Sequence, residues 1–209
     1  MTVKLVWSTP NGDDLIAYMA RASNPDAVLG EKTPRLIRYL LDHNHWSPFE
    51  MTNMCVEINT TRDIGRQILR HRSFSFQEFS QRYAQVNPFS GYIRPARIQD
   101  PTNRQNSLPC NDEELKAWWR KVQDDIGLTA QENYYEALQR GVAKEVARAI
   151  LPEGLTETKM YMNGNVRSWL TYFKTRIGHG TQKEHEDIAK ELYSVFSQNY
   201  PDTARAFEL

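Results

Sequence analysis

Residues 51–60 carry the clearest alternation of side-chain character in this chain of 209 residues. Met54, Val56 and Ile58 alternate with polar residues at positions 53, 57 and 59. A period of two residues predicts a β-strand that buries one face and leaves the other open to water. The chain therefore contributes a half-buried strand to a sheet, and the fold has to place this strand among segments of a different periodicity.

Most of the other segments repeat their apolar residues at the spacing of an α-helix. Within residues 33–43, the apolar positions 36, 37, 40 and 41 share one face, and Pro34 stands near the first turn. The expected helices cover residues 13–21, 33–43, 63–70, 112–140, 144–151, 166–177 and 184–197, with Gly127 as a candidate break in the longest one. Further strands are expected at 4–8 and 156–162, and a turn at 45–50. The sequence thus predicts a single helix-rich α+β domain over residues 1–209.

Residues 74–104 show no steady period and are rich in glycine, proline, asparagine, serine and aromatic residues. In a small domain, an irregular stretch of this length is usually functional or mobile. Between residues 60 and 105 there are eight arginines, no lysine and three acidic residues, which gives a local formal charge of +5. The exclusive use of arginine favours planar, bidentate recognition of anions.

The rest of the composition narrows the class of protein. The formal net charge is zero, which argues against a protein that coats nucleic acid. Two cysteines cannot form a disulfide framework, so Cys55 is expected in the core or a strand and Cys110 in a loop. No apolar run approaches the ~20 residues that span a bilayer, and the N-terminus lacks the pattern of a signal peptide, so a cytoplasmic location is expected. The histidines at 43, 179 and 185 lack metal-ligand spacing, and no metal site is expected.

One segment gathers groups that suit an anionic ligand. Residues 70–82 read Arg-His-Arg-Ser-Phe-Ser-Phe-Gln-Glu-Phe-Ser-Gln-Arg. Phosphates favour guanidinium groups, and sugars favour a carboxylate such as Glu78, so this mixture predicts a nucleotide site. A solvated surface or a salt-bridge network is an alternative reading of so many arginines. The interleaved aromatic residues also permit RNA binding, which the neutral total charge and the lack of lysine disfavour.

The same segment resembles the signature of flavin-dependent thymidylate synthases, Arg-His-Arg-x-x-Ser-x-Asn-x-x-Ser-x-Arg. Six of seven fixed positions match, namely Arg70, His71, Arg72, Ser75, Ser80 and Arg82, and Gln77 replaces the asparagine. Four other segments follow the family's order: His45-Trp-Ser-Pro-Phe-Glu50, Gln67, Ala147-Arg148-Ala-Ile-Leu151-Pro152, and Asn165-Val-Arg167-Ser168 with Arg176 after it. Two further departures are Thr171, where the family usually has asparagine, and Gly178-His179-Gly180, where it has a histidine slightly later. The resemblance covers about residues 36–190.

The resemblance implies the family's fold, in which helices surround a small antiparallel sheet, and the family's reaction. That reaction converts dUMP to dTMP with FAD as cofactor, methylenetetrahydrofolate as the one-carbon donor and NADPH as the reductant. The flavin carries the redox chemistry, and the protein supplies position and charge. The family also implies a homotetramer whose sites lie between subunits, and it implies no nucleic-acid or membrane partner.

The resemblance also implies residue roles. FAD would be contacted by Ser47, Arg70, His71, Arg72, Glu78, Asn165, Val166, Arg167 and Thr171, with His45 beside flavin and folate. The substrate dUMP would be contacted by Gln67, Ile68, Leu69, Arg70, Glu78, Phe79, Ser80, Gln81, Arg82, Arg148 and Arg176.

Arg176 is the expected catalytic residue. An arginine stays protonated and cannot act as a base, but it can stabilise negative charge that develops at the uracil N3 and carbonyl oxygens. A structural alternative is that Arg176 pairs with a helix acid such as Glu184. Ser80 has no evident partner base in the sequence and is assigned to binding rather than to nucleophilic attack.

Two other functions stay open at this stage. One is transfer of a different one-carbon group to dUMP, such as hydroxymethyl, which the departures at Gln77 and Thr171 motivate. The other is a nucleotide- or RNA-binding protein without catalysis. The sequence Pro109-Cys110 faintly echoes the loop of the unrelated, cysteine-dependent thymidylate synthases, and a loop cysteine without a role is the preferred interpretation.

Overall fold

A four-stranded antiparallel sheet organises the chain. The computed structural model describes residues 1–22, 33–89, 91–178 and 180–207. The sheet order is β1-β2-β6-β3, formed by Thr2–Ser8, Asn53–Thr61, Glu157–Asn165 and Ser75–Glu78. The two central strands, β2 and β6, pair along their whole length, from Asn53 opposite Asn165 to Thr61 opposite Glu157. Strands far apart in the sequence are therefore neighbours, and β6 joins the signature segment to the rest of the sheet.

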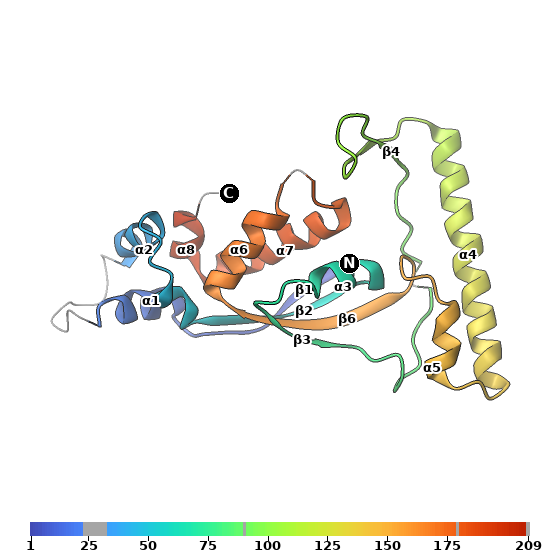
Figure 1. Cartoon of the computed structure of the whole chain (residues 1–209), viewed down its shortest axis with the longest axis horizontal. Helices are drawn as coiled ribbons and strands as arrows, with labels where there is room; N and C mark the ends of the chain where they lie inside the picture. The colour runs from blue at the N-terminus through green and yellow to red at the C-terminus, as the bar shows by residue number, and fades with distance from the viewer. Residues whose placement is uncertain (23–32, 90, 179, 208–209) are drawn as a thin grey trace.

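The two faces of the sheet differ in burial, as the alternation in the sequence predicts. On β6, the side chains of Thr158, Met160 and Met162 are buried, whereas Lys159 and Tyr161 are exposed. The buried face packs against α6 (Val166–Arg176) and α7 (Lys183–Asn199), which lie over it in Figure 1. This contact forms the main core, because burial of large apolar side chains is the dominant favourable term in folding.

The remaining helices sit at the two ends of the sheet (Figure 1). At one end lie α1 (Gly12–Ala20), α2 (Thr33–Asp42), the short helix η1 (Ser47–Glu50) and α8 (Pro201–Ala206). At the other end the 27-residue α4 (Glu113–Gln139) stands beside the sheet as an arm, followed by α5 (Lys144–Ala147) and η2 (Arg148–Ile150). A two-stranded hairpin, β4 (Arg97–Gln99) and β5 (Ser107–Pro109), connects the core to this arm. The helix α3 (Arg62–Ile68) follows β2 directly.

The predicted fold class is confirmed: the chain is helix-rich and α+β with a small antiparallel sheet. Each predicted helix and strand is present, with ends that differ by one to three residues for most of them. The predicted helix at 144–151 is a four-residue α-helix followed by a 3₁₀ turn. Cys55 lies buried in β2 as expected, and Cys110 lies in a loop but is buried rather than open to solvent.

Two local predictions are wrong, and one helix was not predicted. Residues 74–104 are not wholly irregular, because β3 and β4 lie within them and gain their order from pairing with β6 and β5. The helix α4 is not broken at Gly127, where a missing side chain lets the ring of Phe89 pack against the helix. A Cβ at this glycine would lie 2.5 Å from the Phe89 ring. The short α8, which begins at Pro201, was not expected from the sequence pattern.

The described ranges contain neither a candidate membrane span nor a candidate metal site. Within them, no helix is long and apolar enough to cross a membrane. Within the same ranges, no cluster of three or more histidine, cysteine or acidic side chains has a geometry suited to a metal ion. His179, one of the histidines considered above, lies outside the described residues.

Candidate active site

The signature segment runs from the end of α3, through a turn at residues 69–74, into the edge strand β3. The turn is held by backbone hydrogen bonds from His71 N to Ile68 O (3.1 Å) and from Phe74 N to His71 O (3.2 Å). Phe74 is buried against Gly164 of β6, where a Cβ would come within 2.4 Å of its ring. The glycine thus lets Phe74 anchor the turn to the sheet, and His71 and Ser73, which precede it, contact α6.

Arg176, at the end of α6, meets His71 in this turn. The Arg176 Nε donates a hydrogen bond to His71 Nε2 over 2.8 Å, across 105 residues of sequence. Burial, together with the charges of Arg176 and Arg70, lowers the pKa of His71 to about 4, so the imidazole is neutral near pH 7. A neutral ring can accept a hydrogen bond at Nε2, and this fixes the direction of the guanidinium. Within the described chain, neither terminal nitrogen of Arg176 has a hydrogen-bond partner or an ion pair, so both are available to a ligand.

The structural alternative for Arg176, an ion pair with Glu184, is not observed. Glu184 pairs instead with Arg97 of β4, with an Nη1–Oε1 distance of 2.7 Å. Two residues that the sequence analysis gave no role lie behind the Arg176–His71 pair: the ring of Tyr172 contacts His71 edge-on at 4.8 Å between centroids, and its hydroxyl bonds His185 Nε2 at 3.0 Å. Tyr172 lies one helical turn before Arg176, and this spacing is the sequence signal that points to it.

Most of the residues predicted to contact the flavin gather where η1 meets the start of α6. The Asn165 side chain caps α6 by accepting from Ser168 N at 2.9 Å. Ser168 Oγ in turn donates to the carbonyl of Ser73 at 3.2 Å, which ties the signature turn to the same helix end. Arg167 pairs with Glu50 and lies over the Trp46 ring at 5.7 Å. Ser47 and Thr171 are exposed nearby on the same two elements.

The arginines of the basic region divide into two groups. Five of them pair with a carboxylate of the chain: Arg62 with Glu78, Arg66 with Glu153, Arg82 with Glu145, Arg94 with Asp63, and Arg97 with Glu184. In the free chain the salt-bridge interpretation describes these five guanidinium groups, and a role of any of them in anion recognition stays a prediction. Arg70, Arg72 and Arg104 are exposed, and no described residue pairs with their guanidinium groups. Of the predicted site residues in this region, Arg70 and Arg72 are therefore the ones without a carboxylate partner in the described chain, and Arg176 joins them from α6.

Several predicted contacts are not presented to a ligand through their side chains. Ile68 and Val166 are fully buried in the apolar core, and Val166 N donates to the carbonyl of Thr52 at 3.0 Å. Gln81 is only 4% exposed, and its Nε2 has no hydrogen-bond partner. Glu78 accepts from the Thr158 hydroxyl at 2.8 Å, in addition to its ion pair with Arg62. Leu69 is half-buried and Phe79 is partly exposed.

A second group of predicted dUMP contacts lies apart from Arg176, where the chain that follows β3 meets α5. Arg82 pairs with Glu145 at 3.6 Å, and Arg148 Nε donates to the Glu145 carbonyl at 3.4 Å. The Ser80 hydroxyl accepts from Arg82 N at 3.4 Å, and no basic side chain among the described residues contacts it. Between this group and the group of Gln67, Arg70, His71 and Arg176, the described residues contain no hydrogen bond or ion pair.

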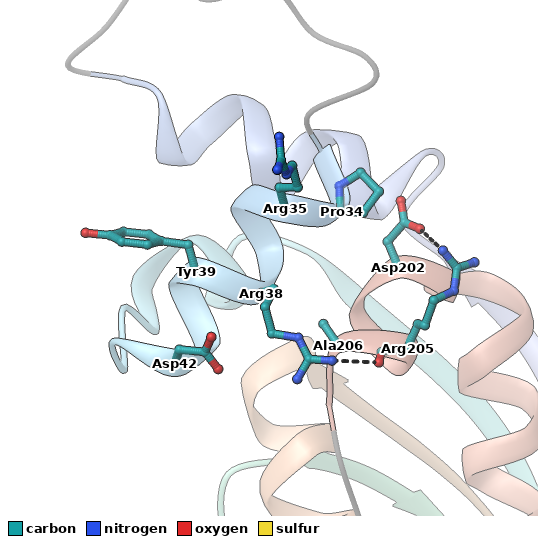
Figure 2. Close-up of a pocket in the computed structure, with 8 residues that line it drawn as sticks. All are labelled: Pro34, Arg35, Arg38, Tyr39, Asp42, Asp202, Arg205 and Ala206. Carbon is teal, nitrogen blue, oxygen red and sulfur yellow. Dashed lines mark hydrogen bonds and ion pairs between the residues drawn. The ribbon is translucent and has the colours of Figure 1, made fainter.

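Two other cavities lie outside the signature segment. Figure 2 shows a cavity of about 470 Å³ between α2 and α8, lined by Arg35, Arg38 and Arg205 among others. Two of its arginines contact the chain itself: Arg205 pairs with Asp202 at 3.2 Å, and Arg38 donates to the Arg205 carbonyl at 3.3 Å. A cavity of about 510 Å³ lies between the β4–β5 hairpin and the start of α7, with Cys110 on its wall.

Comparison with known proteins agrees with the motifs. The family model described as "Thymidylate synthase complementing protein" matches residues 4–202. A flavin-dependent thymidylate synthase of Synechocystis sp. is 47% identical and covers 96% of this chain and 90% of its own length. A probable flavin-dependent thymidylate synthase of Paramecium bursaria Chlorella virus 1 is 43% identical and covers 100% of this chain and 96% of its own.

The fold comparison points the same way. A crystal structure of a UMP/dUMP methylase from Streptomyces cacaoi, bound to 5-Br UMP, matches with a TM-score of 0.85 at 26% identity. The match covers 99% of this chain and 92% of that one. The order of motifs, the contact between the signature turn and Arg176, the family model and the curated relatives all agree, and the chain belongs to the flavin-dependent thymidylate synthase family.

Proposed function

We propose that this chain makes dTMP from dUMP, with methylenetetrahydrofolate as the one-carbon donor, FAD as the cofactor and NADPH as the reductant. Family membership supports the flavin and the thymidylate product, and the dUMP-acting structural relative supports the substrate. The observation that carries the proposal is the contact between Arg176 Nε and neutral His71, which leaves both terminal guanidinium nitrogens without a partner among the described residues. A non-catalytic nucleotide- or RNA-binding role gains no support from any of the relatives.

Arg176 is proposed to activate the pyrimidine. Its terminal nitrogens donate to the uracil edge and stabilise negative charge that develops at N3 and the carbonyl oxygens. His71 contributes by holding Nε, so that the guanidinium does not need to reorient during the reaction. No side chain is proposed to bond covalently to dUMP, because no basic side chain of the described residues contacts Ser80 and Cys110 is only 5% exposed.

The chain's residues fit a flavin dinucleotide at the signature turn. Arg70 and Arg72 are exposed guanidinium groups to which the described chain gives no carboxylate, which suits the two phosphates of FAD. Ser47, Arg167 and Thr171 lie along the adjoining start of α6 and η1, where they can contact the rest of the cofactor. When bound, the flavin supplies the hydride that reduces the transferred one-carbon unit.

We further propose that the chain works as a homotetramer whose nucleotide site is shared between subunits. Two observations support this. The predicted dUMP contacts form two separate groups in one chain, and a second chain can bring one group to the other. The arm of α4 and α5 also exposes large apolar side chains, such as Trp118 at 58%, Ile126 at 50% and Val146 at 58%, which suits an interface.

The first test is the colour and the product. The purified protein is expected to show a flavin absorption band and to convert dUMP, methylenetetrahydrofolate and NADPH to dTMP, identified by mass. A colourless protein that takes up no added FAD would contradict the proposal. A product heavier than dTMP by one oxygen would instead indicate hydroxymethyl transfer, the alternative that Gln77 and Thr171 motivate. A cytoplasmic location stays a prediction from the sequence.

UMP is a second candidate substrate. The structural relative from Streptomyces cacaoi is a UMP/dUMP methylase, and it was solved with the 5-bromo derivatives of both nucleotides. Side-by-side reactions with UMP and dUMP separate the two candidates. Preference for dUMP by a factor of ten or more supports the thymidylate proposal, and equal rates would assign both nucleotides as substrates.

A further inference from the structure

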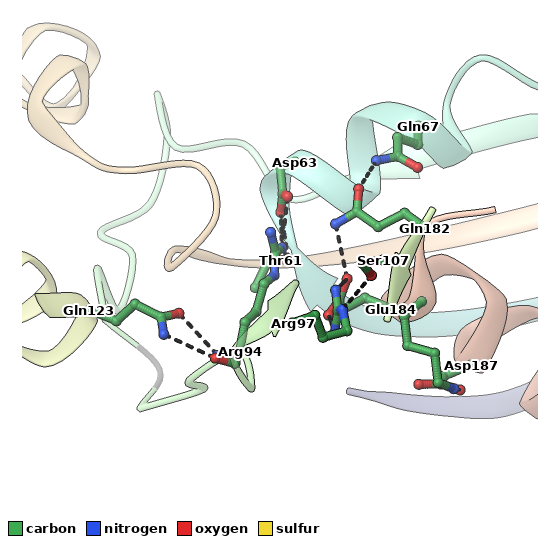
Figure 3. Close-up of polar contacts among 11 residues, drawn as sticks. Thr61, Asp63, Gln67, Arg94, Arg97, Ser107, Gln123, Gln182, Glu184 and Asp187 are labelled. Atoms are coloured by element: carbon green, nitrogen blue, oxygen red, sulfur yellow. Dashed lines mark hydrogen bonds and ion pairs between the residues drawn. The ribbon is translucent and has the colours of Figure 1, made fainter. Parts of the chain in front are cut away.

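A chain of hydrogen bonds connects the β4–β5 hairpin to the candidate nucleotide site. Its first link is the ion pair between Arg97 of β4 and Glu184 of α7, in which both guanidinium nitrogens reach the carboxylate, at 2.7 and 3.0 Å. Gln182 Nε2 donates to Glu184 Oε2 at 3.0 Å, and Gln67 Nε2 donates to Gln182 Oε1 at 2.6 Å. Figure 3 shows these four side chains as a continuous line of contacts, which ends on Gln67 of α3, a predicted dUMP contact.

The same chain continues behind the Arg176–His71 pair. His185 Nδ1 lies 3.2 Å from Gln67 Oε1, and His185 Nε2 lies 3.0 Å from the Tyr172 hydroxyl. His185 is fully buried, and Tyr172 packs edge-on against His71. The chain therefore begins at a surface hairpin and ends beneath the residue that orients Arg176.

Glu184 is the one charged acceptor in this series of hydrogen bonds. Its side chain is 2% exposed, and its charge is compensated by the Arg97 guanidinium. Burial acts to raise the pKa of Glu184, but the hydrogen bonds from Arg97 and Gln182 outweigh it and leave the pKa below its usual value. The group is thus a carboxylate near pH 7, and a carboxylate can only accept hydrogen bonds.

A group that only accepts sets the direction of every bond that follows. Gln182 must present its NH₂ to Glu184, so its oxygen faces Gln67. Gln67 must then present its NH₂ to Gln182, so its oxygen faces His185. Facing an oxygen, His185 must carry its proton on Nδ1. One carboxylate therefore determines two amide orientations and one histidine tautomer.

We propose that Glu184 is a positioning residue that orients the Gln67 amide for the nucleotide. The amide has two N–H donors, and Gln182 takes one of them. The other stays on the same side of the amide and is available to an acceptor oxygen of dUMP. Without the Glu184 carboxylate, the hydrogen bonds can form with the amides of Gln182 and Gln67 in either orientation. Gln67 then presents its oxygen, instead of an N–H, to the nucleotide part of the time. This inference rests on the proposed function for its ligand, and on the hydrogen-bond chain alone for its direction.

The ion pair between Arg94 and Asp63 provides a matched control. Arg94 belongs to the same segment between β3 and α4, and its Nη2 lies 2.7 Å from the Asp63 carboxylate (Figure 3). Its backbone bonds Gln123 of α4, so this pair also fastens the hairpin region to the core. The Asp63 carboxylate bonds Thr61 and Arg94, and among the described residues no side-chain hydrogen bond or ion pair joins it to Gln67, which lies one turn later in α3, or to Gln182 or His185. Loss of either ion pair loosens the segment between β3 and α4. Only the loss of Glu184 changes the donor-to-acceptor direction of the hydrogen bonds that lead to Gln67 and His185.

The experiment compares Glu184→Gln with Asp63→Asn in the flavin-loaded, full-length protein. For Glu184→Gln we expect the dissociation constant and the KM for dUMP to rise on the order of tenfold, with a smaller change in kcat. The ¹⁵N shifts of histidine-labelled protein, with His185 assigned by its substitution, are expected to change from one Nδ1–H tautomer to a mixture. For Asp63→Asn both readouts are expected to match the parent protein.

The inference is overturned if Glu184→Gln leaves the His185 tautomer and dUMP binding unchanged, or if Asp63→Asn changes both equally. If Glu184→Gln does not fold, Gln182→Leu interrupts the chain while Glu184 keeps its ion pair, and the same two results are expected and decide in the same way. If the parent protein makes no dTMP, the proposed function fails, but the tautomer and equilibrium dUMP binding still test the positioning role.

Discussion

The two groups of predicted dUMP contacts differ in how they are held. Gln67, His71 and Arg176 belong to elements packed on the sheet, and buried polar contacts fix them from behind. Arg82 and Arg148 lie at the base of the arm, where Arg82 and Glu145 are 59% and 57% exposed. An exposed ion pair contributes little to stability and is easily exchanged for another partner.

This difference suggests a division of labour. The packed group is preorganised within one chain, which suits stabilisation of developing charge, because preorganised donors do not reorient during the reaction. The exposed group is free to turn toward an incoming phosphate or a second subunit. The following experiments test whether the division is real.

The largest effect is expected in the packed group. Arg176→Ala removes the group that stabilises charge on the pyrimidine, and dTMP formation is expected to fall about 100- to 1000-fold. Arg176→Lys keeps the positive charge but loses the planar fork and the fixed Nε contact, and it is expected to recover only a small part of the rate. Single-turnover formation of dTMP, with flavin content measured in parallel, checks both variants. Activity of Arg176→Ala within threefold of the parent protein would remove Arg176 from the mechanism.

The next effect concerns the exposed group and its subunit. Arg82→Ala is expected to raise the KM for dUMP roughly 10- to 100-fold, because a charge-assisted contact to the nucleotide is lost. If the two groups of one site come from different chains, mixed oligomers of Arg82→Ala and Arg176→Ala contain sites with both arginines intact. Co-refolding equal amounts is then expected to restore activity to about a quarter of the parent value at low dUMP.

Failure of that mixture to regain activity, when its mass shows that mixed oligomers have formed, would place both groups in the same chain. The division between the groups would then be one of packing only. Mixtures of each variant with itself, refolded in the same way, are the controls.

The sequence predicted the helices and strands that depend on local periodicity. The helices α2, α6 and α7 and the strand β2 follow from the spacing of their own apolar residues. The edge strand β3 does not, because Ser-Phe-Gln-Glu has little strand character and is ordered by β6, about 80 residues later. The predicted break in α4 at Gly127 was wrong for the same reason, since the Phe89 ring that packs there is distant in sequence.

The candidate site was likewise predictable only in part. Residue identities within the motifs were readable, because each motif is contiguous. The sequence did not show which arginines form ion pairs within the chain. The acids that pair with Arg94 and Arg97 lie at positions 63 and 184, and this pairing depends on the fold. The role of His185 was missed because a buried histidine without metal spacing gives no signal in the sequence, and that of Tyr172 was missed because its spacing from Arg176 was not used.

A smaller effect is expected on stability as the pH falls. The pKa of His71 in the folded chain is about 4 and that of His185 about 3, both lowered chiefly by burial, whereas an unfolded histidine titrates near 6.5. The folded chain is therefore most stable, with respect to these two histidines, above pH 6.5. This stability is lost as the pH falls toward 4 and below, because the unfolded chain binds protons that the folded chain does not. Between pH 7 and 5 we expect each histidine to lower the free energy of unfolding by about 1–2 kcal/mol.

His71→Gln sharpens this measurement. Glutamine can still accept from Arg176 Nε but does not titrate, so urea unfolding of this variant is expected to depend less steeply on pH than that of the parent protein. Arg82→Ala, in the exposed group, is expected to keep the parent slope. Equal slopes for all three proteins would show that the packed group is not held by a neutral histidine.

The smallest effect is expected at Cys110, which lies just before the arm. Its thiol is 5% exposed, and Sγ lies 3.7 Å from the Asp112 carbonyl, so it fills space and is shielded from solvent. Cys110→Ala removes one small buried group, which costs about 1 kcal/mol of stability, and turnover of dUMP is expected to stay within twofold of the parent protein. A collapse of dTMP formation, with flavin content and oligomer mass unchanged, would make this thiol a nucleophile. The packed group would then assist covalent catalysis instead of activating the pyrimidine alone, and the chemistry would have to be assigned to the loop before α4.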